Sequence, residues 1–441
     1  MSTATHSQTD LTVVRWQRGV PVFGVPVRTK NFLFLSALTL LGFVLIIYRQ
    51  VFGLGAATGL SDGFPWGIWK TFNVMTLTAL GSGSFPIGIA AWLFHKRRLH
   101  AVMRTTLLIS FLVYLTGLLA IAVDVGRPWN VYNFFSIFRW NTMSPMWEVL
   151  WCMPLYCLFP LFLENTPPVL EQLYYFFPPI RGLVIWFVPV IRMTYPFVVA
   201  LAYVLPMMHQ SALGGLMLMA GTQVQALWQT PLLPLLYMWA AAFIGVATTI
   251  GAMMLCCLAW KRPIDQSILD ELVDLMVKLI VWWAIVRMAD IFIRAAFLGQ
   301  FMKMLTPWWL VLLFLAEMLL IVVPTLRLRR KEVREDNYQL FLSCALIALG
   351  GLGYRFDPTT FAYRHWSRVH YTPAIIEILI CLGFICFCIV GFLWAVKRLP
   401  ILPAPVEQWY ESENYYRKIY PYIQLSGYGD NKDQHRPSYA D

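Results

Sequence analysis

The feature that most constrains this chain is a series of ten long apolar runs, separated by polar or charged segments. A helix needs about 20 mostly apolar residues to cross the hydrocarbon core of a bilayer. Because no water is present there to satisfy the backbone, each run must form a helix. The chain is therefore predicted to be an all-α polytopic membrane protein with about ten transmembrane helices. The runs cover residues 31–48, 66–94, 105–124, 146–164, 183–207, 230–259, 272–299, 307–326, 338–354 and 373–396.

The composition and the first residues agree with a membrane protein. The chain is 59% hydrophobic and only 13% charged, whereas soluble domains contain about 25% charged residues. The first 30 residues are polar and show no cleavable signal peptide, so the first run is expected to be a retained anchor. We expect a cytoplasmic N-terminal segment (1–30), a transmembrane domain (31–398) and a cytoplasmic C-terminal tail (399–441).

Basic residues are concentrated in alternate connections between the runs. Examples are HKRRLHAVMR at 95–104 and RLRRKEVR at 327–334. Connections rich in Lys and Arg stay in the cytoplasm, so both termini are predicted to be cytoplasmic and the odd-numbered connections to face outward. The formal net charge of +11 then reflects orientation and contact with anionic lipid rather than a nucleic acid partner.

The outward connections have an unusual composition. They include SDGFPWGIWK at 61–70, DVGRPWN at 124–130 and MHQSALGG at 208–215. Trp and Tyr are common at any membrane interface. The Gly, His, Gln and Asp residues among them are not explained in this way. These segments are therefore candidates for a site near the outer surface, with Trp66, Trp129, Gln210 and Ser211 among its residues.

Several ionisable residues lie within or at the ends of the apolar runs. A charge at the bilayer centre costs roughly 2.5–3.5 kcal/mol on insertion scales, so such residues are functional candidates. With the predicted orientation, all except Glu317 fall in the outer third of the membrane, which favours one shielded site. These residues are Asp124, Glu148, His209, Asp290, Glu317 and Glu377.

Some of these residues also fit a structural role. Arg287, Asp290 and Arg294 are three and four residues apart, so they share one helix face and can neutralise one another. Asp124 and Arg127 equally fit a cap that fixes the connection after the third run. Both interpretations stay open at this point.

For three other residues, the sequence supports a functional role to different degrees. Glu148 has no basic neighbour within one helical turn, which favours a functional role. Glu317 is more isolated, and the sequence does not distinguish the two roles. His209 is either a satisfied histidine at a helix end or a ligand contact, and the neighbouring HQSALGG sequence favours the contact.

The positions of the cysteines and histidines restrict which cofactors the chain itself could bind. All eight Cys lie in apolar runs, and none forms a C-x-x-C pair. An iron–sulfur cluster is therefore expected only in a partner. Of the seven His residues, only His209 lies near membrane depth. A haem with two histidine ligands is not expected, and no metal site is predicted.

Three functions fit these residues. A redox subunit that handles quinone would need an apolar cavity, donors for the carbonyls and carboxyls that supply protons. A transporter would use the buried acids as a relay and an interrupted helix, for which Glu317 and GSGSFPIG (81–88) are suitable. A passive anchor for an extrinsic complex would need neither.

Several motifs together resemble the NrfD-like (polysulfide reductase membrane subunit) superfamily. In chain order they are GFPWGIWKTF (63–72), DVGRPWN (124–130), MWEVLWCMPLY (146–156), MHQSALGGLMLMAG (208–221) and RLPILP (398–403). Within the superfamily, the sequence is most similar to the Hyb-type membrane subunits of quinone-reducing nickel–iron hydrogenases.

The resemblance implies a fold and a function. It implies two four-helix bundles, from helices 2–5 and 6–9, with flanking helices. It also implies electron exchange between a periplasmic-side iron–sulfur subunit and the quinone pool, menaquinone or ubiquinone, at a bacterial inner membrane. The catalytic partner would be a nickel–iron hydrogenase, or a molybdopterin or multihaem enzyme of the same group.

The resemblance also assigns roles to residues. Glu148 matches the family's acid on the fourth helix, implicated in proton transfer, and Glu317 and Glu377 match further acids. With Asp290, they form the predicted proton-transfer set. His209 matches the family's histidine, and Asp124 to Arg127 match its Asp-Val-Gly-Arg turn. The predicted quinone site consists of His209, Asp124, Arg127, Trp129, Trp66, Gln210 and Ser211.

Overall fold

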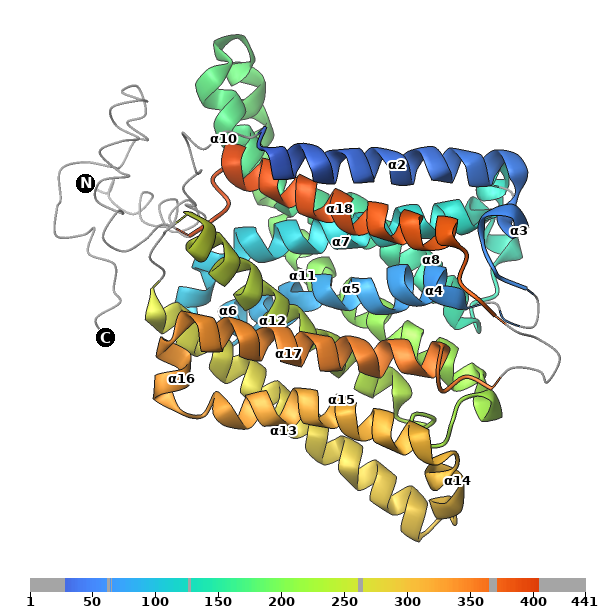
Figure 1. Ribbon diagram of the computed structural model, residues 1–441. Coiled ribbons are helices and arrows are strands. Elements are labelled where there is room, and N and C mark those ends of the chain that lie inside the picture. Colours follow the sequence, from blue (N-terminus) through green and yellow to red (C-terminus); the bar gives the residue numbers. More distant parts are fainter. Residues whose placement is uncertain are drawn as a thin grey trace.

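The computed structural model describes residues 28–61, 64, 66–125, 128–260, 265–364 and 371–403. Within these ranges the chain is almost entirely helical, and its few β contacts are two isolated bridges. Long helices run side by side and reverse direction at each connection (Figure 1). The predicted all-α polytopic fold is confirmed.

Ten long helical segments correspond to the ten predicted runs. Shorter helices connect them: α3 (Leu54–Ala57), α10 (Thr166–Phe176), α14 (Phe301–Leu305) and α16 (Lys331–Glu335). The long segments are α2 (Lys30–Phe52), α4 to α6 (Gly67–Trp92), α7 (Met103–Asp124), α8 (Pro145–Tyr156) with α9 (Phe162–Glu164), α11 (Arg181–Met219), α12 (Leu233–Trp260), α13 (Gln266–Ala296), α15 (Trp308–Arg327), α17 (Asn337–Phe356) and α18 (Ile375–Arg398).

Nine helices among the described residues are long and apolar enough to cross a membrane. The tenth segment, α13, has 31 residues but is not one of the nine. Its sequence contains seven charged residues, which lower its hydropathy. They are Asp270, Glu271, Asp274, Lys278, Arg287, Asp290 and Arg294.

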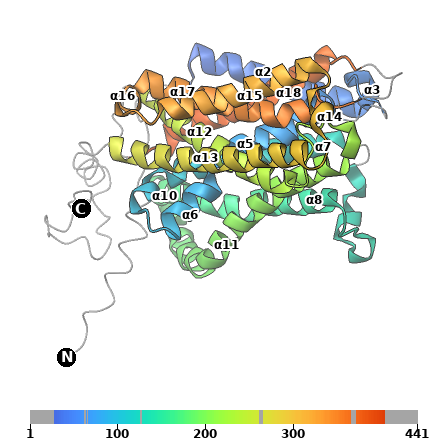
Figure 2. The same ribbon diagram turned by 90° about the horizontal axis from the view of Figure 1, so that it is seen from below.

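The two ends of the helices form opposite faces of the molecule (Figures 1 and 2). We call the end where α2 and α7 begin and α18 ends the basic face, because Lys30, Arg104 and Arg398 lie there. The opposite end, where α7 ends and α8 begins, is the aromatic face. The predicted assignment of the basic face to the cytoplasm remains a prediction.

Close helix crossings depend on glycine pairs. A Cβ on Gly42 would lie 2.8 Å from the Cα of Gly383, so α2 and α18 pack with their backbones in contact. A Cβ on Gly245 of α12 would lie 2.0 Å from the backbone nitrogen of Gly83. Small residues allow this close approach in membranes, where van der Waals packing holds helices together.

We divide the helices that follow α3 into two groups by their order in the chain. The first group contains α4 to α6, α7, α8 with α9, and α11, and the second contains α12, α13, α15 and α17. However, α12 packs extensively against α11 and against η2 (Gly81–Gly83) of the first group. The two groups thus share a long seam, and the division into two bundles stays an expectation.

Three turns in the first group are not regular α-helix. Residues Thr71–Thr76 and Cys157–Leu161 form π-helical turns, and Gly81–Gly83 forms a 3-10 turn. Such irregular turns inside helices are frequent at functional sites. The GSGSFPIG segment therefore does interrupt its helix, as the sequence indicated.

One predicted boundary was wrong. The fifth run was expected to end at residue 207 with His209 at the helix end, but α11 continues to Met219. His209 is therefore inside the helix and fully buried. Pro206 does not end the helix, because membrane helices tolerate proline where neighbouring groups satisfy the backbone. Gly214 lets this extra part pack closely against α12, where a Cβ would lie 2.5 Å from the Leu233 carbonyl oxygen.

Candidate functional site

His209 is the centre of a buried polar cluster in the first helix group. Its imidazole packs edge-on against the ring of Tyr114, with 5.4 Å between ring centroids. Both ring nitrogens are buried and have no hydrogen-bond partner among the described residues. Because buried polar groups are normally hydrogen-bonded, these nitrogens are available to a ligand or to water.

Gln210 fixes the position of Tyr114 beside this histidine. Its Nε2 donates hydrogen bonds to the Tyr114 hydroxyl at 2.9 Å and to Thr78 Oγ1 at 3.3 Å. Ser82 Oγ lies 3.0 Å from the same tyrosine hydroxyl. The Oε1 atom of Gln210 is buried with no hydrogen-bond partner in the described structure. The cluster thus contains an amide oxygen that accepts no hydrogen bond, as well as the unpaired imidazole of His209.

A second tyrosine continues the cluster toward the middle of the molecule. The rings of Tyr114 and Tyr156 pack edge to face with centroids 4.8 Å apart. The Tyr156 hydroxyl lies 2.6 Å from Ser84 Oγ. Hydroxyl contacts thus join Ser84 of α6 to Tyr156 of α8, and Ser82 and Gln210 to Tyr114 of α7. Ring packing joins the two sets.

Glu148 lies in the first turn of α8, near the aromatic face. It is half-buried and makes no ion pair or side-chain hydrogen bond with another described residue. One turn further along α8, Cys152 packs in the same apolar cluster as Tyr114 and Tyr156. Because α8 also packs along α11, Glu148 lies one helical turn from the apolar cluster that contains Tyr114 and Tyr156.

Ser211, Trp66 and Trp129 do not join this cluster. The Ser211 hydroxyl donates to the Met208 carbonyl of its own helix at 2.9 Å. Trp66 is half-buried against the main apolar core. Trp129 is 69% exposed on η4 (Pro128–Phe135), and its place in the quinone site remains a prediction.

Asp124 ties three helices together at the aromatic face. Its carboxylate pairs with Lys70 at 3.1 Å, and its backbone carbonyl accepts a hydrogen bond from Arg49 of α2 at 3.0 Å. These contacts correspond to the structural interpretation of this residue. Arg127, its predicted companion, lies outside the described residues.

Glu377 holds the segment before α4 in place. Its carboxylate accepts hydrogen bonds from the backbone amides of Trp69 at 3.0 Å and Gly59 at 3.3 Å. The Tyr371 hydroxyl donates a hydrogen bond to the same carboxylate at 2.7 Å, and it accepts a hydrogen bond from the Ile68 backbone amide. Burial raises the pKa of Tyr371, which keeps its hydroxyl protonated as a donor. Every partner of Glu377 is thus a structural one.

Asp290 and Arg294 form a buried ion pair at 2.7 Å in the second helix group. Thr230 donates to Asp290 at 2.6 Å, and Arg294 donates to the Gln229 carbonyl at 2.8 Å. Arg287 does not take part, because it donates to the Leu227 carbonyl and lies over the rings of Phe314 and Tyr354. The expected neutralisation therefore occurs for Asp290 and Arg294 only.

Glu317 is buried in the second group beside a second carboxyl. The indole nitrogen of Trp228 donates to both of its oxygens, at 3.1 and 3.2 Å. The Asp357 carboxyl lies nearby, because a Cβ on Gly353 would be 3.5 Å from Glu317 Cγ and 3.8 Å from Asp357 Oδ2. Two neighbouring buried carboxyls can share one proton.

The sequence did not single out several of these side chains. Tyr114 and Tyr156 were missed because a lone tyrosine in an apolar run is normally a packing residue. Asp357 was missed because it falls at the end of an apolar run, where acids are common. The internal SxS spacing of Ser82 and Ser84 was a usable signal.

The described histidines lie in two parts of the molecule. His209 lies within α11, whereas His95 and His100 lie between α6 and α7, at the basic-face end. Within the described ranges, no group of three or more His, Cys, Asp or Glu side chains is placed to hold a metal ion. His365 and His370 lie outside those ranges.

A family model and several known proteins match this chain. The model described as "Polysulphide reductase, NrfD" matches residues 56–357. The "Probable Ni/Fe-hydrogenase 2 b-type cytochrome subunit" of Escherichia coli (strain K12) is 31% identical over 394 residues, which are 87% of this chain and 95% of that protein.

Two further relatives match over shorter stretches. The "Menaquinone reductase, integral membrane subunit" of Nitratidesulfovibrio vulgaris is 34% identical over 120 residues, 27% of each chain. The "Hdr-like menaquinol oxidoreductase integral membrane subunit" of Archaeoglobus fulgidus is 29% identical over 113 residues, 24% of this chain and 28% of that protein.

Proposed function

Because this chain belongs to the NrfD family of polysulphide reductase membrane subunits, we propose that it is the quinone-interacting subunit of a respiratory oxidoreductase in a bacterial inner membrane. It passes electrons between an extrinsic iron–sulfur subunit and the quinone pool. The names of the relatives support this role, because two of them are membrane subunits of menaquinone or menaquinol oxidoreductases.

The observation that carries the proposal is the unpaired imidazole of His209. A quinone carbonyl is a hydrogen-bond acceptor, and a neutral imidazole offers one N–H donor. The hydrogen bond from Gln210 to Tyr114 holds the tyrosine ring beside this donor. Since a buried unsatisfied donor costs free energy, a bound quinone carbonyl would recover that cost.

Glu148 is the proposed proton donor to the reduced quinone. Reduction of a quinone consumes two electrons and two protons, and the protons must come from a group at the site. A half-buried carboxyl with no ion-pair partner is suited to gain and lose a proton. We propose Glu317 with Asp357 as a second proton-carrying pair, and we assign Glu377, Asp124 and Asp290 to structural contacts.

The exposed loop at the aromatic face is the proposed docking surface for the iron–sulfur subunit. It carries large apolar side chains that no described residue covers: Trp129, Tyr132, Phe135, Phe138 and Met143. Exposed apolar patches mark interaction sites. On this proposal the aromatic face is periplasmic, and Trp129 contacts the partner instead of the quinone.

The proposed electron donor is a nickel–iron hydrogenase. The support is the 31% identity to a hydrogenase membrane subunit along 95% of that protein. A molybdopterin or multihaem enzyme would use the same membrane site with a different extrinsic partner. A haem in this chain would need a second axial ligand beyond His209, and no step proposed here passes through one.

A comparison of two electron acceptors tests the function. Membranes that contain the whole complex should reduce a menaquinone analogue with electrons from the catalytic subunit. Without this chain, the soluble subunits should still reduce an artificial dye but not the quinone. Equal quinone reduction with and without the chain would exclude the proposal.

A further inference from the structure

A compact set of aromatic and basic side chains is buried in the second helix group. We call it the donor cluster, and its members are Tyr237 of α12, Trp283 and Arg287 of α13, and Tyr354 of α17. Tyr237 lies near the start of α12 and Tyr354 near the end of α17, so the cluster is in the half of the molecule toward the aromatic face. The helix α12 packs against both α13 and α17 (Figure 1).

The ring of Tyr354 joins the other members of the donor cluster. Its centroid is 5.1 Å from that of Trp283 and 5.5 Å from that of Tyr237. The guanidinium carbon of Arg287 lies 5.2 Å from the same centroid. Trp283 and Arg287 are four residues apart on α13, so they share one helix face. The four side chains therefore form one contiguous group.

Most polar atoms of the donor cluster have no partner. Arg287 donates a hydrogen bond from Nη2 to the Leu227 carbonyl at 2.7 Å. Its Nε and Nη1 atoms, the Trp283 indole nitrogen and the two tyrosine hydroxyls are buried without a hydrogen-bond partner in the described structure. Because buried donors are normally paired, five unpaired ones in contacting side chains indicate a bound ligand.

The buried charges of the second helix group also lack one negative charge. The buried cations are Arg287, Arg294 and Arg355, and the buried acids are Asp290, Glu317 and Asp357. Asp290 pairs with Arg294, whereas Arg287 forms no ion pair with any described carboxylate. When the neighbouring carboxyls of Glu317 and Asp357 share one proton, three positive charges face only two negative ones.

The chemistry of the donor cluster defines the missing ligand. It must accept several hydrogen bonds and carry one negative charge. A water molecule carries no charge, and it would need acceptors for its own two hydrogens. A halide ion accepts hydrogen bonds, donates none and supplies the charge. The attraction between such an ion and a guanidinium is strong in the interior, where solvent screens it little.

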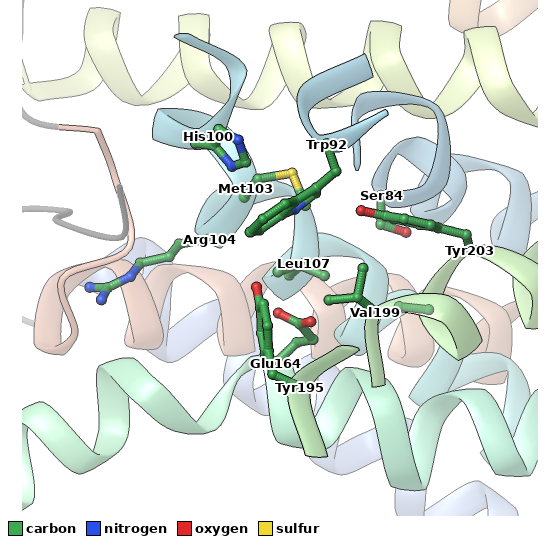
Figure 3. Close-up of a pocket in the computed structure, with 11 residues that line it drawn as sticks. Ser84, Trp92, His100, Met103, Arg104, Leu107, Glu164, Tyr195, Val199 and Tyr203 are labelled. Carbon is green, nitrogen blue, oxygen red and sulfur yellow. The ribbon is translucent and has the colours of Figure 1, made fainter. Parts of the chain in front are cut away.

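The pocket in the first helix group has a different character (Figure 3). Its lining includes the carboxyl of Glu164 as well as the side chains of His100 and Arg104. A carboxyl in the lining disfavours an anion, because a like charge would have to be buried beside it. The donor cluster contains no carboxyl, so the excess of donors is a local property of the second group.

We propose that the donor cluster binds one small monovalent anion, of which chloride is the form tested. The anion accepts hydrogen bonds from Arg287, from the Trp283 indole and from the tyrosine hydroxyls. It neutralises the buried guanidinium and so holds α12, α13 and α17 together. This site goes beyond the proposed quinone function and does not depend on it.

The effect of chloride on stability tests the site. The whole complex is purified in detergent, exchanged into gluconate by gel filtration and titrated with chloride at constant ionic strength. The melting temperature should rise by several degrees and then saturate, because a ligand of the folded state stabilises it. Retained chloride is counted by ion chromatography after the exchanged complex is unfolded. If the anion exchanges too slowly for the titration, this count should give one chloride per chain.

Variants locate the anion. Trp283→Phe and Tyr354→Phe each remove one donor and keep an aromatic ring, so each should raise the chloride concentration for half of the effect at least fivefold and lower the retained chloride. The matched controls Trp282→Phe and Tyr338→Phe, at exposed side chains of the same helices, should match wild type. Arg287→Gln should abolish both signals. If that variant does not assemble, the Trp283 and Tyr354 variants decide.

Two results would overturn the inference. Equal melting temperatures in gluconate and chloride, with no retained chloride, would mean that water pairs the donors. A chloride effect that is unchanged in Trp283→Phe and Tyr354→Phe would place the anion elsewhere in the complex. A complex that shows the chloride effect but reduces no quinone would contradict only the proposed function.

Discussion

Gln210 donates a hydrogen bond to the Tyr114 hydroxyl at 2.9 Å, and this contact joins α11 to α7 one residue from the unpaired imidazole of His209. Two neighbouring residues of α11 thus have different roles. Gln210 positions the Tyr114 ring, and both ring nitrogens of His209 have no hydrogen-bond partner among the described residues.

His209→Leu is expected to impair quinone binding without loss of stability. The change removes two buried nitrogens that have no protein partner, so no hydrogen bond within the protein is lost. The concentration of a quinone-analogue inhibitor needed for half inhibition should rise at least tenfold, and the melting temperature should stay within about 2 °C of wild type. An unchanged inhibition curve would place the quinone elsewhere.

Glu148→Gln is expected to separate proton transfer from electron entry. The amide keeps the size of the side chain but cannot carry the proton. Quinone-linked turnover should fall at least tenfold, whereas dye reduction and assembly of the complex should match wild type. Glu332→Gln, at an exposed acid of α16, is the control. Turnover at the wild-type rate in the Glu148 variant would refute the proton role.

Glu377→Ala is expected to lower stability and not only activity. It removes the acceptor for the Trp69 and Gly59 amides and for the Tyr371 hydroxyl. Each buried donor left unsatisfied costs about 1–3 kcal/mol. The melting temperature in detergent should drop by several degrees, and Tyr371→Phe should give a smaller drop. If stability is unchanged while turnover is lost, Glu377 belongs to the proton path after all.

Asp290→Ala is expected to destabilise the second helix group. Removing one partner of a buried ion pair costs about 3–5 kcal/mol, because the other charge stays buried. The double variant Asp290→Ala with Arg294→Leu should recover part of the lost melting temperature. The exposed pair Lys331 and Glu335 serves as a comparison, since surface pairs contribute about 0–1 kcal/mol. Additive losses in the double variant would mean that the two side chains act independently.

The membrane fold was predictable because lipid leaves few alternatives. Each apolar run has to become a helix, so the helices and their order followed from residue type alone. The end of α11 did not follow, because Pro206 and the small, polar residues of HQSALGG also fit a loop. Only the contact of Gly214 with α12 shows why the helix continues there.

The candidate site was predictable in part. Buried acids and His209 stood out because their burial is costly. Their partners did not, since a sequence does not tell which backbone amides meet Glu377 or that Arg294 faces Asp290 while Arg287 does not. Trp129 was assigned to the quinone site because it lies in a recognised motif, and its side chain is exposed. The contact between the rings of Tyr114 and Tyr156 depends on how α7 and α8 pack, which the sequence alone does not show.

A photoreactive menaquinone analogue, followed by peptide mapping of the labelled complex, tests the central claim most directly. If quinone binds at His209, adducts should lie on α11 around that residue and on the facing parts of α7 and α8. Excess menaquinone should compete with this labelling, and His209→Leu should reduce it at least tenfold. Adducts confined to α13, α15 and α17, or to α2 and α18, would contradict a quinone site in the first helix group.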